Sequence, residues 1–382
     1  MRKSQKRALL VALVAAPAFA GLARGQAQLV VSPTSVTMTS DSYENPSQLL
    51  TVTSSNGSPI SFLVSSSGGA AFQVVPVGPQ VGTIMTTPAS FNVICSCLNR
   101  GSGTYSGSVN FAPPAPLPTV VVPVTIVVAQ LGPPQITSVL NAASFANASA
   151  SPGEVVSVFG ANLGPAAPLG AKLDSTGKMS TSLGGVSVIF FNGSLAEYYA
   201  PLTYVSATQI NCEVPYEVMQ WTGAWLEVGY VGGWFIPPGP NIQLAAASPG
   251  IFTATGTGTG QAAALNYDNT PNTTSNPAPA GSIVQVYMTG EGQTSPAGVT
   301  GSVTCSNGCA TTSQIPKPLS PVTAFVGGQP ATVAFYGEAP ALVSGVMQVN
   351  VLVPANTPSG AVSLAVTVGS NSTQAGVTIA VK

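Results

Sequence analysis

The sequence contains no histidine, and charged residues make up only 5% of its 382 residues. Histidine is the commonest general base, the commonest metal ligand and the usual partner of a catalytic serine or cysteine. Its absence removes Ser-His and Cys-His catalytic pairs and histidine-based metal sites, although chemistry by carboxylates alone stays open. The composition therefore argues against an enzyme.

Basic residues are scarce as well, and they are unevenly placed. Five of the ten lie within the first 24 residues, so the rest of the chain has five basic against eleven acidic residues, a formal net charge of 5 − 11 = −6. No basic run follows, which argues against nucleic acid or an anionic membrane as partner. Because 45% of the residues are hydrophobic, the chain is expected to fold, with Ser, Thr, Asn, Gln and Gly over its surface.

Long apolar runs are missing except at the start of the chain. The basic segment MRKSQKR precedes the apolar segment ALLVALVAAPAFAGLA, which is short and is followed by small residues suited to cleavage. Residues 1–27 are therefore predicted to be a secretory signal peptide. Gly, Pro, Ser and Thr interrupt every later apolar run, so no transmembrane segment is predicted. The mature chain is expected to be secreted or extracellular and associated with the cell surface.

Five cysteines in an exported chain indicate disulfides with one cysteine left over. Cys305 and Cys309 bracket the turn sequence Ser-Asn-Gly and are predicted to form a disulfide at a hairpin tip. Cys95 and Cys97 would share one face of a strand, near the upper distance limit for a bridge, so pairing requires a local bend. Cys212 has no evident partner and is expected to be a small buried apolar residue.

Helical periodicity is almost absent, and short alternating runs take its place. These runs are bounded by Gly, Pro, Asn or Ser, with 41 Gly and 34 Pro in the chain, which is typical of antiparallel sandwiches. The fold class is therefore predicted as all-β, with tandem immunoglobulin-like β-sandwiches after the cleaved signal peptide. The predicted strands cover residues 49–55, 91–95, 120–128, 154–160, 185–191, 282–288, 361–368 and 376–381.

The predicted domains are a sandwich over 28–128, a stiff Pro-containing linker at 129–134, a second sandwich over 135–247 and a third over 248–382. The third is predicted to repeat the second, since QINCEVP at 209–215 returns as QVNVLVP at 348–354. The extra residues of the third domain fall around the CSNGC loop, which is interpreted as an addition to the common scaffold. Tandem units of this kind are expected to stack as a rod.

Alternation along QINCEVP places Ile210, Cys212 and Val214 on one face, and that face is expected to be core. Gln209, Asn211 and Glu213 lie on the other face. The Gln and Asn amides of both copies are expected to bond neighbouring backbone, and the proline ends the strand. The phrase is therefore interpreted as a marker of the fold rather than as a ligand site.

Two resemblances follow from ordered motifs. PPQITSV, SPGEVVSVFGANLGP, YVSATQINCEVP, ASPGIFT, MTGEG and MQVNVLVP run in one order over residues 135–382 and resemble an uncharacterised C-terminal family of exported acidobacterial proteins with IPT/TIG-like immunoglobulin domains. That resemblance implies export and the fold, but no chemistry. LVVSPTSVTMT, GTYSGSVNF and VVVPVTIVV within 28–128 resemble BACON-type domains of bacterial surface proteins, which implies glycan binding or a spacer role.

The aromatic residues of QWTGAWLEVGYVGGWF are the best candidates for a binding site. The candidates are Trp221, Trp225, Tyr230 and Trp234. Because Trp225, Val228 and Tyr230 do not keep one strict alternation, some of the rings are expected to be exposed and to form a sugar platform. The alternative is that these rings cover the open end of a sandwich or a domain interface.

Glycoside hydrolysis requires two facing acids, and the sequence offers two candidate pairs, Glu213 with Glu217 and Glu197 with Glu227. A solvated position on the surface is the expected reading for these acids. No cofactor is predicted apart from structural calcium, for which Asp41 in DSYEN and Asp268 in NYDNTPN are the candidate ligands. Asx turns explain both segments equally well.

The sequence thus predicts an exported, non-enzymatic surface or extracellular protein with a structural or adhesive role. The alternative is a carbohydrate-binding protein that uses the aromatic cluster of the second domain, and a third class is a secreted hydrolase. The expected partners are an extracellular glycan or another surface protein.

Overall fold

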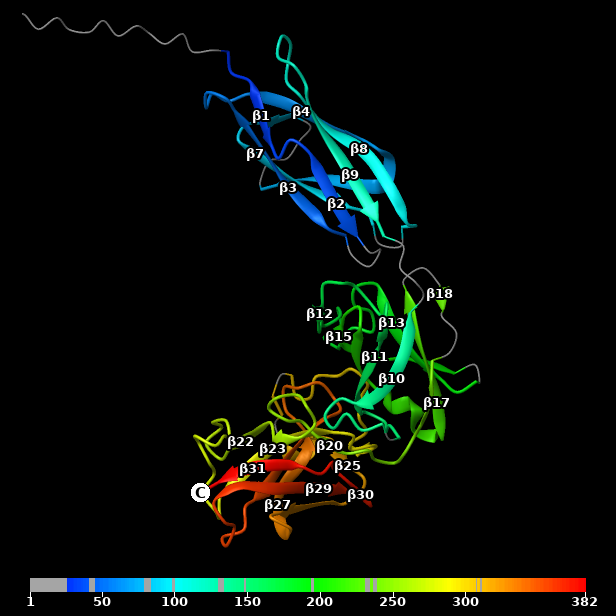
Figure 1. The fold of residues 1–382 in the computed structure, drawn as a ribbon, viewed down its shortest axis with the longest axis vertical. Helices are drawn as coiled ribbons and strands as arrows, with labels where there is room; N and C mark the ends of the chain where they lie inside the picture. Colours follow the sequence, from blue (N-terminus) through cyan, green and yellow to red (C-terminus); the bar gives the residue numbers. More distant parts are fainter. Residues whose placement is uncertain are drawn as a thin grey trace, which may run out of the picture.

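The computed structural model describes residues 26–40, 45–78, 84–97, 100–129, 134–147, 149–193, 196–230, 234–235, 239–306, 308–309 and 311–382 (Figure 1). For Tyr230, Trp234 and Phe235 it describes the backbone alone. The described part is built of β-strands and three short 3₁₀ turns, η1 (Gly69–Ala71), η2 (Tyr216–Gln220) and η3 (Thr312–Gln314). The predicted fold class, tandem immunoglobulin-like β-sandwiches, is confirmed. Residues 1–25 of the predicted signal peptide and 130–133 of the predicted linker lie outside the described residues.

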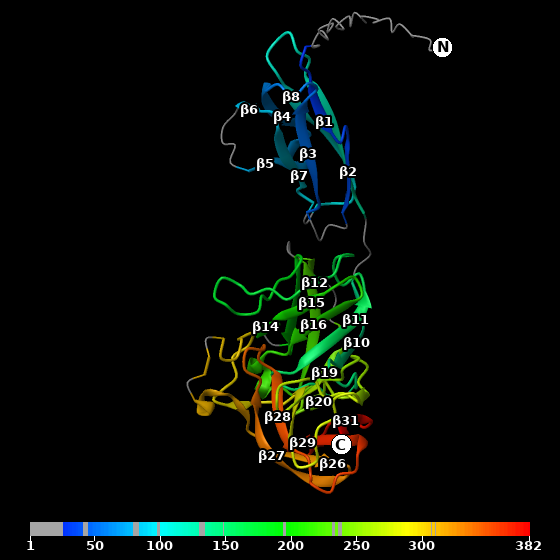
Figure 2. The same ribbon diagram turned by 90° about the vertical axis from the view of Figure 1, so that its left-hand side faces the viewer.

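Three sandwich domains follow one another along the long axis of the molecule, with the first domain at one end and the third at the other (Figures 1 and 2). None of the helices in the described part has the length and apolar character needed to cross a membrane.

The first domain packs two sheets face to face. One sheet has the order β1 (Leu29–Ser32), β3 (Ser47–Ser54), β7 (Ala89–Cys95) and β5 (Phe72–Val77); the other has β2 (Val36–Ser40), β9 (Val120–Val128), β8 (Gly103–Ala112), β4 (Ser61–Ser67) and β6 (Ile84–Thr86). Strands β2 and β9 pair in parallel, and the other strand pairs are antiparallel.

Alternation builds the core of the first domain. In β9 the residues Val122, Val124, Ile126 and Val128 are buried, while the residues between them face outward. Three phenylalanines fill the centre of this core, with ring centroids 5.5–6.2 Å apart, and they are Phe62, Phe91 and Phe111. These tilted and edge-on contacts add to the burial of apolar area.

The second domain also has two sheets. The first has the order β10 (Gln135–Asn141), β11 (Val155–Ala161), β16 (Gln209–Glu213), β15 (Leu202–Val205) and β12 (Leu169–Gly170). The second has the order β14 (Glu197–Tyr199), β13 (Val186–Phe191), β17 (Gly223–Tyr230) and β18 (Trp234–Phe235), and β19 (Asn241–Gln243) also pairs with β17.

The third domain forms one continuous sheet that folds into two layers. Its order is β20 (Gly250–Ile251), β23 (Ile283–Thr289), β28 (Val346–Leu352), β27 (Gln329–Glu338), β26 (Val322–Val326), β29 (Gly360–Val368), β31 (Val377–Val381) and β21 (Gly260–Gln261). Strand β22 (Ala264–Asn266) pairs with β23, β30 (Asn371–Ser372) pairs with β29, and β24 (Thr294–Ser295) pairs with β25 (Lys317–Pro318). The long strand β27 passes between the layers, because its first residues pair with β26 and its later ones with β28.

In both the second and the third domain, a glycine turn is hydrogen-bonded to the residue just after the strand that carries the repeated sequence. The amide of Gly153 donates to the carbonyl of Val214 at 2.8 Å, and the amide of Gly281 donates to the carbonyl of Val353 at 2.9 Å. Both glycines have positive φ, 76° and 81°, a conformation that favours residues without a Cβ. The repeated sequence phrase thus occupies β16 in one domain and β28 in the other.

One face of the repeated sequence lies in the core as predicted, but the amide groups on the other face bond differently from the prediction. Ile210, Cys212 and Val214 are fully buried in the core, as predicted. The amides, however, bond side chains rather than backbone: Nε2 of Gln209 donates to Oδ1 of Asn211 at 2.8 Å. The same bond joins the Gln and Asn of β28 at 2.8 Å.

Truncation of Phe91 to alanine should destabilise the first domain by about 3–5 kcal/mol, because it removes a fully buried ring and leaves a cavity. Differential scanning calorimetry of the full chain should show a lower first-domain transition and an unchanged transition for the rest. The matched control is Leu49→Ala, since Leu49 is 48% exposed in the neighbouring strand, and it should change stability by about 0.5 kcal/mol or less. Equal effects of both variants would contradict the assignment of this core.

Candidate functional site

The predicted aromatic cluster divides between two places. Trp225 lies in β17 between the buried residues Ala224 and Leu226, so its ring points away from the core. Trp221 follows η2 and packs against the core of the second domain, where its ring stacks on that of Tyr198 with centroids 5.3 Å apart. The structure therefore does not bring Trp221 and Trp225 together.

The other two predicted residues are Tyr230 and Trp234. They face each other in the backbone register of β17 and β18, and their side chains lie outside the described residues.

The outer face of the β14–β13–β17–β19 sheet brings Trp225 against a residue that sequence reasoning did not select. Phe191 lies opposite Trp225 in the register, and the two rings are 5.7 Å apart with an interplanar angle of 32°. The same row of the sheet continues to Glu197 beside Phe191 and to Asn241 beside Trp225. Two rings are thus flanked by a carboxylate on one side and an amide on the other.

A second row on the same face holds Tyr199, Ile189 and Glu227 in register across three strands. Tyr199 is 48% exposed, and Ile189 is buried beneath its neighbours. Partial burial raises the pKa of Glu227, and the nearby charge of Glu197 raises it further. We call these six residues the aromatic face: Phe191, Glu197, Tyr199, Trp225, Glu227 and Asn241.

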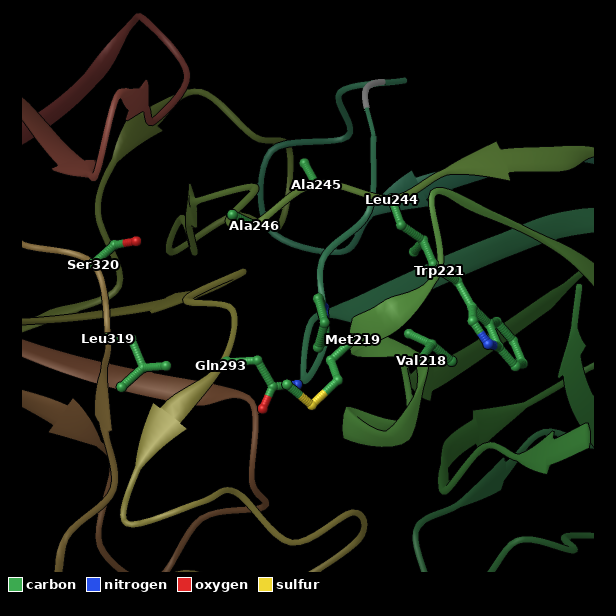
Figure 3. Close-up of a pocket in the computed structure, with 10 residues that line it drawn as sticks. Val218, Met219, Trp221, Leu244, Ala245, Ala246, Gln293, Leu319 and Ser320 are labelled. Carbon is green, nitrogen blue, oxygen red and sulfur yellow. The ribbon is translucent and has the colours of Figure 1, made fainter. Parts of the chain in front are cut away.

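Trp221 instead borders a cavity of about 290 Å³ between the second and third domains (Figure 3). Met219 lines the cavity from the second domain, and Gln293 and Leu319 line it from the third. Met219 and Leu319 are 52% and 67% exposed, so the mouth of the cavity is apolar. The prediction that some rings lie at a domain interface therefore describes Trp221.

Beside this cavity, Tyr216 enters a slot between the two domains. It is 4% exposed, and its ring lies between Gly153 and Gly298. A Cβ atom built on either glycine would lie 2.4 Å from the ring, closer than any real contact. The phenol donates to Oε1 of Glu338 at 3.1 Å, and Oε1 of Glu291 lies 3.5 Å away.

Three glutamates meet at this junction, and all are at most 1% exposed. Glu213 of the second domain accepts bonds from the third domain, namely the Gly301 amide at 3.0 Å and the Ser344 hydroxyl at 3.0 Å. Glu338 accepts a bond from the Thr304 hydroxyl. Oε2 of Glu291 is buried and has no hydrogen-bond partner among the described residues.

Burial shifts the pKa of each of these groups upward. Because removal from water penalises the charged form, desolvation holds the pKa of Glu213 and of Glu291 well above the usual range, and it also raises the pKa of Glu338. Burial at the junction therefore favours the neutral form of these carboxyl groups. The prediction that Glu213 is a solvated surface residue is wrong, because the third domain covers its face of β16.

A fourth buried glutamate links the first turn of the second domain to the start of the third. Glu154 accepts bonds from the Ser151 amide at 2.7 Å and from the Asn141 side chain at 2.9 Å. The Asn141 amide also donates to the carbonyl of Ser248 at 2.9 Å. Desolvation raises the pKa of Glu154 to about 8, although these hydrogen bonds oppose the shift.

The loop around CSNGC does more than decorate the third domain. The Gly301 carbonyl accepts from the Met179 amide at 2.7 Å, and the Thr300 hydroxyl accepts from the Tyr216 amide at 2.9 Å. Cys305 and Cys309 are disulfide-bonded in this loop, with Cα atoms 5.0 Å apart. The loop thus joins the two domains directly.

The remaining cysteines divide into a bonded pair and a free thiol. Cys95 and Cys97 are bonded with Cα atoms 5.2 Å apart, and β7 ends at Cys95, which supplies the required bend. Cys212 is a free, fully buried thiol.

The calcium prediction has one described candidate. Oδ1 of Asp268 accepts from the hydroxyl of Thr270 at 2.6 Å and from its amide at 3.0 Å, and these bonds lower the pKa of the carboxyl. This is an Asx turn, the alternative reading of the segment. Within the described ranges no group of three His, Cys, Asp or Glu side chains is placed to hold a metal ion. Asp41 lies outside the described residues.

Comparison with known proteins gives no family. No family model matches the sequence, and no curated protein matches it.

Among solved structures, SGBP-B of the Bacteroides ovatus mixed-linkage glucan utilisation locus, in complex with a mixed-linkage heptasaccharide, matches at 14% identity over 96% of this chain and 69% of that chain, with a TM-score of 0.28. Domains 5–6 of the S-layer protein SbsC match at 14% identity over 57% of this chain and 96% of that chain, with a TM-score of 0.20. The D00-D0 domain of intimin matches at 11% identity over 58% and 100%, with a TM-score of 0.18. Similarity this loose transfers no site or activity to this chain.

Substitution of Gly298 by alanine should weaken the junction by about 1–3 kcal/mol, because the new methyl group overlaps the ring of Tyr216. Denaturant unfolding of the full chain measures the change in free energy. Gly170→Ala is the matched control, since a Cβ there meets nothing within 4 Å, and it should be neutral within about 0.5 kcal/mol. A neutral Gly298→Ala would show that the ring does not occupy this slot.

Proposed function

We propose that this protein is an exported, non-enzymatic surface or extracellular protein with a structural role, in which the second and third domains form one rigid unit. The observation that supports this proposal is the buried junction around Tyr216. An interface that places a tyrosine and three carboxyl groups out of contact with water fixes the angle between two domains. Flexible tandem domains instead meet through small, polar and solvated interfaces.

Backbone contacts add to this rigidity. The amide of Val155 donates to the Thr289 hydroxyl at 2.8 Å, and that hydroxyl donates to the Gly345 carbonyl at 2.6 Å. A Cβ on Gly345 would lie 1.7 Å from the Gly153 carbonyl oxygen, so the two backbones touch. The bond from Val155 to Thr289 and the approach of Gly345 to Gly153 both cross between the domains, and the bond from Thr289 to Gly345 links these two contacts. Such linked contacts favour a fixed spacer over a hinge. The signal-peptide pattern and the resemblances to IPT/TIG-like and BACON-type domains support export and a place at the cell surface.

The second and third domains should therefore unfold together, and the first domain should unfold separately. Differential scanning calorimetry of the full chain should give two transitions, the larger one belonging to the joined pair. Three independent transitions would contradict the rigid unit. Turnover of a glycoside or ester substrate by the purified chain would contradict the non-enzymatic role.

The aromatic face favours adhesion to a polysaccharide as the second candidate function. A pyranose ring presents an apolar CH face with hydroxyl groups around its edge. Phe191 and Trp225 offer adjacent rings for that CH face, and Glu197 and Asn241 lie at both ends of the row to bond the hydroxyls. No lysine or arginine belongs to this face, so a neutral polysaccharide fits it better than an acidic one.

Trp225→Ala should reduce retention on insoluble neutral polysaccharides on the order of tenfold, because truncation removes the larger ring of the pair. Pull-down of the full chain on a panel of such polymers measures the bound fraction. Trp221→Ala is the matched control, because Trp221 borders the cavity instead of this face, and it should bind like the parent chain. Retention that survives Trp225→Ala, or is lost only in Trp221→Ala, would exclude the aromatic face as the adhesive surface.

A further inference from the structure

The junction between the second and third domains collects acids without cations. The charged or titratable groups that face Glu291 are Glu338 and Tyr216, and Tyr216 also faces Glu338. Glu213 is faced by Glu338, by Tyr216 and by Glu217 of η2. Cys212, adjacent to Glu213 in β16, points into the core of the second domain.

One lysine of the third domain, Lys317, is directed toward an aromatic ring. Lys317 of β25 packs its stem near Gly337, and its ammonium group lies 5.8 Å from the centre of the Tyr336 ring. None of the four buried glutamates forms an ion pair with a described residue. Ionisation of one of these carboxyls would therefore leave a buried charge with hydroxyl and amide donors alone, a state that strongly favours exposure to water.

The elements that bury these carboxyls belong to different domains. Glu213 comes from the second domain but is covered by Gly301 and Ser344 of the third. Glu291 and Glu338 come from the third domain but are covered by Tyr216 of the second. Separation of the domains would expose these three groups to water at once while each hydrophobic core stays intact, because the core residues of each sandwich form separate clusters.

We propose that the junction is a proton-operated latch, closed while Glu213, Glu291 and Glu338 are protonated and opened by their ionisation as the surroundings turn alkaline. This goes beyond the structural role, since a rigid spacer requires no titratable groups at its joint. The ligand of the latch is the proton, and its effect is to change the angle between two domains.

The direction of the pH dependence follows from linkage. Each carboxyl has a raised pKa in the closed form and a pKa near about 4.3 once exposed. The stabilisation of the closed form is therefore complete below about pH 4.3 and is lost as the pH rises through the raised pKa values. Glu154, which supports the same junction through Asn141 and Ser248, has a pKa of about 8, so its share is lost between about 4.3 and 8.

The number of protons released on opening sets how steeply the ratio of closed to open molecules depends on pH. For each group that is protonated when closed and ionised when open, the ratio of closed to open molecules falls about tenfold per pH unit. Three such groups give a transition about three times as steep as one. Replacement of a glutamate by glutamine removes one proton from this count and retains the size and neutrality of the side chain.

The test is small-angle X-ray scattering of the full chain between pH 4.5 and 9.5. The parent chain should be most compact at acidic pH and should expand cooperatively as the pH rises. Glu291→Gln combined with Glu338→Gln should shift the expansion to higher pH. The pH dependence of the expansion should also be less steep, corresponding to about two fewer protons released. Asp268→Asn is the matched control, because Asp268 is exposed in a turn of the third domain and bonds Thr270 of that turn, and it should leave the profile unchanged.

Two further measurements report the protonation of the carboxyl groups and distinguish opening of the junction from general unfolding. The infrared band of protonated carboxyl groups should be present in the parent chain at pH 6.5 and reduced in the double variant. Thiol reagent should not react with Cys212 when only the junction opens, since that thiol lies in the core of the second domain, whereas general unfolding would expose it. If the double variant does not fold at pH 5, the single variant Glu338→Gln replaces it, with a loss of one proton expected.

The latch is overturned if the parent chain keeps its compact dimensions up to pH 9.5. It is also overturned if no protonated carboxyl is seen at pH 6.5, or if expansion coincides with reaction of Cys212. The rigid unit of the proposed function would survive the first two of these outcomes. It fails separately if the second and third domains unfold independently at acidic pH.

Discussion

The insertion of Tyr216 between Gly153 and Gly298 is the contact on which the arrangement of the second and third domains depends. The slot exists because neither glycine has a Cβ atom. With the ring in this slot, the phenol lies within hydrogen-bonding distance of Glu338 and Glu291 of the third domain. Once the ring is seated, η2 is held against the loop that carries Thr300. The angle between the domains is thereby fixed by sterics rather than by a broad apolar patch.

The scarcity of basic residues explains how this junction is built. A chain with five basic residues after position 24 has few cations to pair with buried acids. A neutral carboxylic acid costs far less to bury than a carboxylate, and it both donates and accepts hydrogen bonds. Glu213 accepts hydrogen bonds from the Gly301 amide and the Ser344 hydroxyl, and Glu338 accepts from the hydroxyls of Thr304 and Tyr216. These bonds oppose the rise in pKa, and desolvation outweighs them. The same composition that argues against a histidine enzyme thus favours an interface of protonated glutamates.

Local pattern predicts the strands well and their outer faces poorly. The run at 120–128 coincides with β9, and the run at 361–368 differs from β29 by one residue, because alternation of buried and exposed positions is a local property. The same alternation places Glu213 on the face opposite the core, but a single strand gives no sign that another domain will cover that face. One signal was present: Glu213 follows Ile210 and Cys212 and precedes Val214 in an apolar strand, with no cation nearby in the sequence.

The aromatic residues illustrate the same limit for the site. Trp221 and Trp225 are neighbours in sequence, yet the end of η2 and the start of β17 send one ring to the cavity and the other to the outer face. The partner of Trp225 is Phe191, which pairs with it only through the register of β13 and β17. Density of aromatics along the chain therefore selects the domain that carries the aromatic face and one of its residues, Trp225. The composition of the aromatic face is set by strand order, which follows from packing of the whole sandwich and is not written in any short segment.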